Sequence, residues 1–521
     1  MIEDGAFADR ELSREFERLR EAVPAVVEHR QALKLLGADF RYIRKYVDGS
    51  WMALVDPGEG LAGRFGLNRD VMLIYSLVHE LQPAVLSTAE KRRTLLPQNL
   101  SCEDHVVLIS SIDPRSPQKL HAWAQSDPML GIHFSIEGTP DHIARSLLAE
   151  LQRKLASRNL YDETLPVTGA DFFGRRKELT QLQEELRQGK VCGVFGLRKT
   201  GKTSLVKELG RRFVSGRSDR IFVLRDLESL PQRSERLKVE LVQEISQGLL
   251  AAFRAAGVRR AELAELELDA SIGEFKRALA VSLNDCETRG VQVVLALDEI
   301  ESLLGDAETL KEGSRPEVPE FLGALRSLVQ EHSIFNVVVS GITSAAIHRG
   351  ELFGVENPLF NWARSYHIQP MSKVEVDRLT TDVGKRMGVE WSSDSLDKMY
   401  EIAIGDVFLH RTLAAAVVEG LGQDMFPIRV TDENVQAVQR NWRRGVAERL
   451  AQMFGSFERH YPTEASLLRL AAAGDADWGS LEDEYSIEVG RLLDLGLVTE
   501  GADGEIEFGA LCQTLATARV L

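Results

Sequence analysis

One short segment, GLRKTGKT at residues 196–203, restricts the fold of this 521-residue chain more than any other. Two glycines stand five residues apart, and Lys202 and Thr203 follow the second glycine. The apolar run before Gly196 predicts a strand, and the pattern after Gly201 predicts an amphipathic helix. Glycines let a backbone wrap a phosphate without Cβ clashes, and a helix N-terminus attracts an anion. The segment therefore predicts a phosphate-binding loop between a strand and a helix.

The residue types in this loop predict how a nucleotide and its metal ion would be held. Lys202 is expected to reach the β- and γ-phosphates, and the Thr203 hydroxyl is expected to bind Mg²⁺. The alternative is a glycine-rich turn before an ordinary helix. The predicted phosphate-binding residues are Gly196, Leu197, Arg198, Lys199, Thr200, Gly201, Lys202, Thr203 and Ser204.

An acidic pair follows a second apolar run, VQVVLAL at residues 291–297. A strand there delivers Asp298 and Glu299 at its carboxyl end, which is the edge of a parallel sheet where phosphates bind. Asp298 is expected to hold Mg²⁺ together with Thr203, and Glu299 to orient and deprotonate the attacking water. The alternative is an acidic helix cap, because Asp and Glu favour that position.

Two further polar positions leave alternatives open. The run FNVVVSGIT ends in Ser340, Gly341, Ile342 and Thr343, where a polar side chain is a candidate contact for the γ-phosphate or the attacking water; the alternative is a plain strand-to-helix turn. Arg364 is a candidate for stabilising transition-state charge, in its own subunit or in a neighbour's, and the alternative is a surface salt bridge. The predicted catalytic set is therefore Lys202, Asp298, Glu299 and Arg364.

The apolar runs around the loop predict a doubly wound parallel α/β sheet with intervening helices. Strands are expected at residues 191–196, 220–227, 291–297, 335–343 and 364–369. Residues from 372 to about 455 are expected to be all helical. The last segment combines two helical patterns with two short strands around a Gly/Asp turn, which is typical of a winged helix-turn-helix.

The first 160 residues predict a separate, smaller α/β domain. Residues 1 to about 45 are expected to be charged helix, and strands are expected to begin at Val71, Asp104 and Gly131 in a parallel, Rossmann-like arrangement. Asp113, His121 and Glu137 show no catalytic spacing and are expected to be solvated surface residues. The predicted domains are residues 1–160, 161–371, 372–455 and 456–521, with a linker over residues 159–171.

Composition excludes several classes of protein. The net charge of −16 disfavours a nucleic-acid or membrane surface spread over the whole chain. The chain shows no run of 18 apolar residues and no secretion signal, so no membrane partner and a cytoplasmic location are expected. A zinc site is not expected, because the four cysteines lie far apart at Cys102, Cys192, Cys286 and Cys512.

From about Phe172 to the C-terminus, the chain resembles the signalling ATPases of the STAND class. These are close to AAA+ and origin-recognition-type ATPases, and the likeness is strongest to the "archaeal ATPase" branch. The segment FFGRRKELTQLQEEL is similar to the family's FxGRxxEL box, LDEIESLL to its Walker B motif and NPLFNWAR to its PLxxR segment. The resemblance implies ATP with Mg²⁺ as cofactors, a helical lid and a winged helix. It also implies that Phe173, Gly174 and Arg175 lie near the adenine and ribose.

The lid motif departs from the family pattern. The family commonly has Gly-x-Pro at a position where the lid contacts nucleotide. Here IAIGDVFLHR aligns best, with Gly405 matching and Val407 in the place of the proline. The departure predicts slow hydrolysis.

Three functional hypotheses follow. The first is an ATP/ADP switch that controls self-association or a protein partner, a layout analogous to bacterial defence proteins. The second is a nucleic-acid machine whose winged helix grips DNA, and the third is an N-terminal effector enzyme gated by the ATPase. Residues 461–521 hold three basic and twelve acidic side chains, which disfavours DNA binding by this module. The only basic patch nearby lies at residues 439–450, and a solvated or lid-packing helix face also explains it.

Overall fold

The computed structural model contains two compact units, each built around its own five-stranded sheet. One unit comprises Met1–Glu163, Thr380–Leu396 and Ala414–Val435, and the other comprises Thr164–Leu379, Asp397–Leu413 and Gln436–Leu521. The structure describes residues 2–46, 48–65, 67, 69–96, 100, 102–123, 129–156, 159–162, 166–230, 236–311, 315–360, 362–421, 428–501 and 503–517. Among these residues, none of the helices combines the length and the apolar character needed to span a bilayer.

The sheet of the second unit is parallel throughout, with the strand order β12-β6-β9-β8-β7. Its strands are β6 (Cys192–Phe195), β7 (Arg220–Asp226), β8 (Gln292–Asp298), β9 (Phe335–Gly341) and β12 (Arg364–His367). Each strand overlaps one of the five apolar runs in the sequence, so the predicted parallel α/β sheet is confirmed. All seven residues of β9 are buried, as a strand covered on both faces requires.

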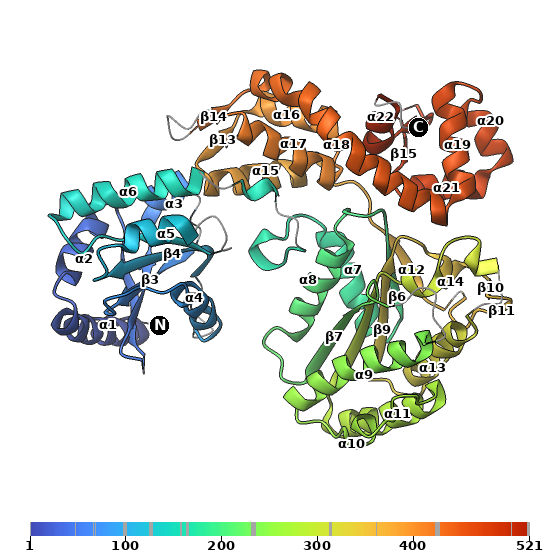
Figure 1. The fold of residues 1–521 in the computed structure, drawn as a ribbon, viewed down its shortest axis with the longest axis horizontal. Coiled ribbons are helices and arrows are strands. Elements are labelled where there is room, and N and C mark those ends of the chain that lie inside the picture. The colour runs from blue at the N-terminus through green and yellow to red at the C-terminus, as the bar shows by residue number, and fades with distance from the viewer. Residues whose placement is uncertain are drawn as a thin grey trace. The chain divides into compact units, whose positions relative to one another are not determined.

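Helices cover both faces of this sheet (Figure 1). Leucines of α7 (Arg176–Arg187) and α8 (Lys202–Val214) pack on one face. The other face is covered by α9 (Leu237–Ala255), α11 (Ile272–Arg289) and α13 (Glu317–Glu331). Short elements connect them: α10 (Ala261–Ala264), α12 (Glu301–Leu304), α14 (Ala345–His348), β10 (Glu351–Leu352) and β11 (Val355–Glu356).

The sheet of the first unit is mixed, which corrects the prediction of a purely parallel one. Its order is β1-β2-β3-β4-β5, with β1 and β2 antiparallel and β3 to β5 parallel. The strands are β1 (Asp39–Lys45), β2 (Trp51–Asp56), β3 (Asp70–Ser76), β4 (Cys102–Ser111) and β5 (Leu130–His133). The expected helix to about residue 45 is therefore wrong over β1, whose two buried residues, Phe40 and Ile43, stand three positions apart as they would on a helix.

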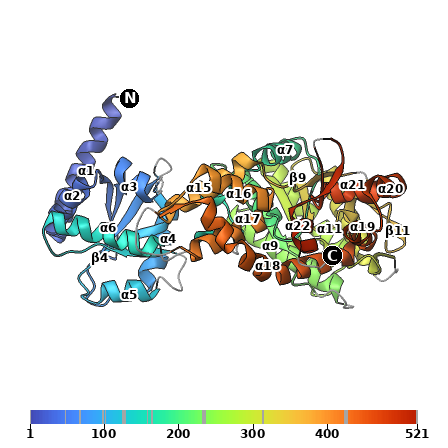
Figure 2. The ribbon, with the colours of Figure 1, turned by 90° about the horizontal axis from the view of Figure 1, so that it is seen from above.

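Two layers of helices enclose this mixed sheet. The helices α1 (Ile2–Ala22), α2 (Val26–Leu35), α3 (Gly58–Phe65) and α6 (Pro140–Ala156) contribute to the core on one face, where α2 and α6 run side by side (Figures 1 and 2). The other face packs against α4 (Ala84–Thr94) and α5 (Ser116–Trp123). The linker predicted over residues 159–171 includes residues 163–165, which lie outside the described residues.

The region expected to be all helical contains α15 (Lys373–Arg386), α16 (Ser393–Ala403), α17 (Val407–Glu419) and α18 (Asp432–His460). The expectation is wrong at two places, because β13 (Val389–Trp391) pairs in parallel with β14 (Ile428–Val430). Both are short β-branched or aromatic segments, which suit a strand better than a helix. Their three-residue length hides them in a sequence dominated by helical periodicity.

The C-terminal module begins with α19 (Pro462–Ala473), α20 (Trp478–Glu484) and α21 (Ser486–Asp494). Two antiparallel strands follow, β15 (Val498–Glu500) and β16 (Ile506–Phe508), and helix α22 (Ala510–Thr517) comes next in the chain. The two predicted helices and the two predicted strands lie at the predicted positions, whereas α20 and α22 were not predicted.

Candidate active site

The loop after β6 has the conformation that an anion cradle needs. Lys199 and Gly201 both take left-handed backbone conformations, with φ of 65° and 96°. A Cβ at Gly201 would meet no atom within 4 Å, so the backbone conformation itself is what favours glycine there. Helix α8 begins at Lys202, and its first N–H groups have no partner within the helix. The loop is anchored to the sheet, because Gly196 N donates to Gly341 O at 3.2 Å.

Lys202 brings a buried positive charge to this loop. Its side chain is 4% exposed, and its ammonium donates to Leu197 O at 3.0 Å. A buried ammonium costs free energy unless it is paired, and one carbonyl oxygen leaves two of its three donors for another acceptor. This donor set fits the phosphates of a nucleotide.

A carboxylate and a hydroxyl meet at the carboxyl end of β8. Thr203 Oγ1 donates to Asp298 Oδ2 at 2.6 Å, although 95 positions separate these residues in the chain. Asp298 is 2% exposed, and its Oδ1 also accepts from the Ser340 hydroxyl and from Glu299 N. Hydroxyl and carboxylate oxygens are the ligands that Mg²⁺ prefers. The pair therefore fits a magnesium ion bound together with nucleotide phosphates.

Glu299 occupies a strained and under-satisfied position beside this pair. Its φ is 55°, an uncommon value for a residue with a side chain, and its Oε2 is buried without a hydrogen-bond partner among the described residues. Burial, and then the neighbouring carboxyl group of Glu301, raise the pKa of Glu299 to about 8. A carboxyl group with a raised pKa suits proton transfer near neutral pH.

The end of β9 completes the site. Ser340 is fully buried, and its hydroxyl bonds Asp298 directly, so its position is more than a plain strand-to-helix turn. One residue beyond the strand, Ile342 N donates to Glu301 Oε2 at 3.1 Å. The sequence offered the polar side chains of Ser340 and Thr343 as candidates but assigned no role to Glu301, and the Thr343 hydroxyl accepts from Ala345 N at 3.2 Å. The only signal for Glu301 was a third carboxylate in the segment DEIES.

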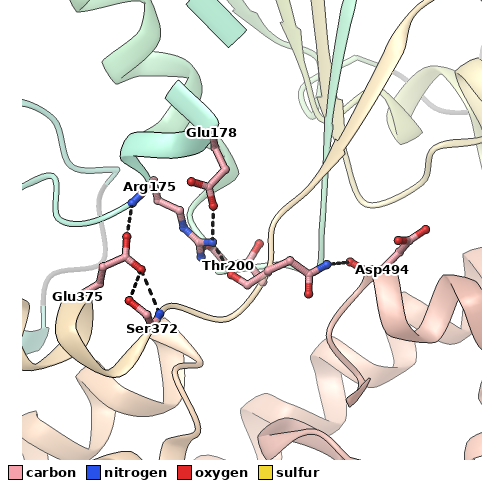
Figure 3. Close-up of polar contacts among 7 residues, drawn as sticks. Arg175, Glu178, Thr200, Ser372, Glu375 and Asp494 are labelled. Carbon is pink, nitrogen blue, oxygen red and sulfur yellow. Dashed lines mark hydrogen bonds and ion pairs between the residues drawn. The ribbon is translucent and has the colours of Figure 1, made fainter. Parts of the chain in front are cut away.

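Arg175 links the phosphate loop to the start of the helical region (Figure 3). It has φ of 58° and is 6% exposed. Its guanidinium donates to Gln369 O and, at 3.5 Å, to Thr200 O, and it pairs with Glu178. Its backbone N donates to Glu375 Oε1 at 2.9 Å. Arg175 thus touches the loop and the segment that leads into α15 at once.

Two neighbours of Arg175 tighten this junction. The Glu375 carboxylate also accepts from the Ser372 N–H and hydroxyl, and these bonds lower the pKa of Glu375 even though burial opposes them. Gly405 has φ of 76°, and a Cβ there would overlap the Met371 carbonyl oxygen. Met371 N in turn donates to Gly405 O at 2.8 Å. Gly405 therefore allows its backbone to lie close to the backbone of Met371.

Several other predicted residues lie at the edge of this arrangement. The Arg198 guanidinium pairs with Glu228 at 3.2 Å on the surface. The Ser204 hydroxyl accepts from Val167 N at 3.1 Å, and Phe173 and Gly174 lie half-buried just before Arg175. Lys199 stacks over the Phe408 ring at 5.0 Å, and Arg449 stacks over the same ring at 5.6 Å. Nothing in the sequence pattern indicated the pairing of Lys199 and Arg449 on one ring.

Arg364 does not lie beside the other three predicted catalytic residues. It pairs with Cys192 at the amino end of β6, and Phe195 is the last residue of that strand. The carboxyl end of β6, where the phosphate loop starts, is therefore roughly 10 Å further along the sheet. The Arg364 side chain is 66% exposed and pairs with Glu185 at 3.0 Å.

In the first unit, Asp113 differs from expectation. It is 4% exposed rather than solvated, and His121 and Glu137 are exposed as predicted. The Asp113 carboxylate accepts from Leu81 N, Arg115 N and Lys119 Nζ. Among the described residues, no group of three or more His, Cys, Asp or Glu side chains is placed to hold a metal ion.

Residues 172–408 match the model of a family described as an ATPase domain predominantly from Archaea. The chain carries an ATPase domain. A sequence search of curated proteins gives no match. The ATPase domain contains every element of the candidate site, from Arg175 to Phe408, except Arg449 on α18.

The fold of the chain is similar to solved P-loop ATPases. A Walker-type ATPase of Pyrococcus abyssi has 15% identity and a TM-score of 0.50, over 69% of this chain and 100% of that chain. At that identity the likeness supports the fold alone. The Orc1 protein of Aeropyrum pernix in complex with DNA has 18% identity and a TM-score of 0.35, over 71% and 98%. The RuvB Holliday junction branch migration motor of Thermotoga maritima has 15% identity and a TM-score of 0.35, over 66% and 95%.

Proposed function

We propose that the protein is an ATP-dependent molecular switch of the STAND type, in which the nucleotide state sets the arrangement of the helical region and the C-terminal module. The junction at Arg175 carries this proposal, because one buried guanidinium bonds both Thr200 in the phosphate loop and Gln369 before α15. Gln369 itself donates through Nε2 to Asp494 O at 2.6 Å, in α21 (Figure 3). A change at the phosphates would therefore move both the segment before α15 and the end of α21.

In this proposal each site residue has one role. The backbone from Gly196 to Ser204 cradles the phosphates of ATP, and Lys202 places its charge on the β- and γ-phosphates. Thr203 and Asp298 hold Mg²⁺, which neutralises charge on the phosphates when it is bound. Glu299 orients the attacking water and accepts its proton. Phe173, Gly174 and Arg175 form the side of the site toward the adenine and ribose.

We assign four domains to this switch: an N-terminal α/β domain at 1–160, an ATPase core at 161–371, a helical lid at 372–455 and a winged helix-turn-helix at 456–521. The winged helix is proposed to contact protein, either another part of this chain or a second copy in the ATP state. Its arginines support this. Arg491 pairs with the buried Glu464 at 2.8 Å, and Arg469 pairs with Glu458. Both guanidiniums are therefore paired with carboxylates of this chain, and Arg519 lies outside the described residues.

Size-exclusion chromatography with light scattering tests the switch. The full chain is measured in Mg·ADP and in Mg²⁺ with a non-hydrolysable ATP analogue, and a Lys202→Ala chain serves as the control. We expect a different elution volume or mass in the analogue for the wild type and no difference for the control. Identical profiles of the wild type in both nucleotides, at concentrations that saturate the site, would contradict the switch.

A gel shift at low salt tests the nucleic-acid alternative. We expect the full chain and a chain lacking residues 461–521 to bind duplex DNA equally, because twelve carboxylates in that module repel phosphates. Micromolar binding by the full chain that disappears with both the deletion and Arg491→Ala would move DNA recognition to first place.

A further inference from the structure

Tyr461 connects the end of helix α18 to the catalytic edge of the ATPase sheet. Its hydroxyl donates to Ile342 O and accepts from Ser344 N, each at 3.3 Å. The side chain is 7% exposed, and its ring stacks on Phe457 with centroids 5.4 Å apart. Tyr461 is also the residue before Pro462, where α19 and the C-terminal module begin. One hydroxyl therefore joins this module to the segment after β9.

The end of β9 and the residue after it make several polar contacts within the catalytic site. Ser340 bonds Asp298, Gly341 O accepts from Gly196 N of the phosphate loop, and Ile342 N bonds Glu301. The Tyr461 hydroxyl bonds the Ile342 carbonyl and the Ser344 N–H, while the Ser344 carbonyl accepts from the backbone of α14. Moving this hydroxyl would therefore disturb the backbone that positions Ser340 and Glu301.

Helix α18 touches the rim of the site at two further points. Ala307 N, in the loop after α12, donates to Arg459 O at 3.1 Å. Ten residues earlier, Arg449 stacks over Phe408, the ring that Lys199 of the phosphate loop also covers. Helix α18 and the residue after it therefore contact three segments around the site, and Tyr461 contacts the one that follows Ser340.

We propose that Tyr461 is a positioning residue for ATP hydrolysis. Its hydroxyl holds the backbone of Ile342–Ser344 so that Ser340 stays on Asp298 and Glu301 stays beside Glu299. The proposal rests on the ATPase switch and deepens it, because it makes turnover depend on how the end of α18 is seated. Removing the hydroxyl leaves a buried carbonyl and a buried N–H without this partner, and the segment shifts to satisfy them.

The experiment compares Tyr461→Phe with wild type in steady-state ATP hydrolysis by the full chain. We expect kcat to fall about three- to tenfold, the effect of one hydrogen bond that orients a catalytic group, with KM for ATP unchanged within about twofold. The matched control is Tyr485→Phe, a half-buried tyrosine of the same module. Thermal melting of both variants accompanies the kinetics.

A double-mutant cycle separates positioning from general stability. Ser340→Ala removes the hydroxyl through which the segment reaches Asp298, so Tyr461→Phe should cost less turnover in that background than in wild type. Full additivity of the two losses, or a kcat for Tyr461→Phe within twofold of wild type, overturns the proposal. These rates are measured independently of the mass in ADP and the ATP analogue. A failure here leaves the switch standing, and a failure of the switch leaves the kinetic result readable.

Discussion

Two aspartates end comparable strands in the two sheets, and their surroundings are opposite. Just beyond β4, the Asp113 carboxylate accepts three hydrogen bonds of 2.9 Å from the backbone and from Lys119. At the end of β8, Asp298 accepts from two hydroxyls, and one buried oxygen of its neighbour Glu299 has no hydrogen-bond partner in the described part of the chain. Hydrogen bonds, the largest from Lys119, lower the pKa of Asp113 to about 2, whereas burial raises that of Glu299 to about 8.

The two strand ends therefore differ in role: the carboxyl end of β4 is a structural edge of its sheet, and the carboxyl end of β8 is a chemical edge, able to bind a ligand or react. A carboxylate whose acceptors are filled by its own chain stabilises a loop and offers nothing to a ligand. A carboxyl group held at φ of 55° with an unpartnered oxygen is destabilised until something binds or reacts there. The same contrast holds for the cations, because Lys119 is bonded to Asp113 and Leu81 O, while Lys202 has one carbonyl.

The largest expected effect comes from removing the cation of the chemical edge. Lys202→Ala should abolish measurable ATP binding, because the ammonium is the main positive charge available to the β- and γ-phosphates. Isothermal titration with ATP and Mg²⁺ measures this, and Lys119→Ala in the other sheet is the matched control that should keep wild-type affinity. Unchanged ATP affinity in Lys202→Ala would contradict the assignment of Lys202 as a phosphate ligand, and with it the contrast to Lys119.

Removing the base should leave binding and slow chemistry. Glu299→Gln is expected to retain ATP affinity and to lower turnover by roughly a hundredfold or more, because the amide still orients water but cannot take its proton. Phosphate release under saturating ATP measures the rate, with Asp113→Asn as the control in the other sheet. Turnover of Glu299→Gln close to wild type would mean that Glu299 only caps the following turn.

Much of this site follows from the sequence because parallel strands end at one edge. The two apolar runs predicted β6 and β8, and the shared edge then predicted that Thr203 and Asp298 meet across 95 positions. Local pattern also predicted a glycine-dependent phosphate loop between β6 and α8. These features depend only on strand direction and on local backbone conformation.

Other features depend on tertiary approach and had no local signal. Tyr461 meets Ile342 and Ser344 from more than 100 positions away, and no spacing rule predicts which residue a long helix delivers. Strand β1 was not predicted, because charged residues interrupt the alternation of apolar and polar side chains that marks a strand. The burial of Asp113 likewise depends on the loop after β3, through Leu81.

The two carboxyl groups should shift stability in opposite directions. Between its ordinary value of 4.5 and about 8, the folded protein keeps a proton on Glu299 that the unfolded chain has lost, so stability falls as pH rises through this window. Glu299→Gln should therefore raise the Tm of the nucleotide-free protein, more at pH 9 than at pH 6. Asp113→Asn should lower Tm at pH 7, because the stability from its depressed pKa is present above about 3.8 and is lost only in acid.

Differential scanning calorimetry across pH measures both effects in the absence of nucleotide. The variants are compared with wild type in the same buffers, and the sign of the change in Tm is the readout. A Glu299→Gln protein whose gain in Tm is the same at pH 6 and pH 9 would show that Glu299 ionises normally. The contrast between the pKa shifts of Glu299 and Asp113 would then be wrong.

The smallest effect is expected from Arg364→Ala in dilute protein. Arg364 is the first residue of β12, so it lies at the amino end of a parallel strand, opposite to the end where phosphates bind. Its exposed pair with Glu185 contributes little, so kcat should stay within about twofold of wild type where the chain is monomeric. A role in a neighbouring subunit would appear only when chains associate. ATPase rates are therefore measured over a range of protein concentrations, and a loss that grows as the wild-type chains self-associate would place Arg364 at a partner's site. A loss of tenfold or more at the lowest concentration would contradict the position of Arg364 far from Lys202, and with it the rule that only one edge of this sheet is chemical.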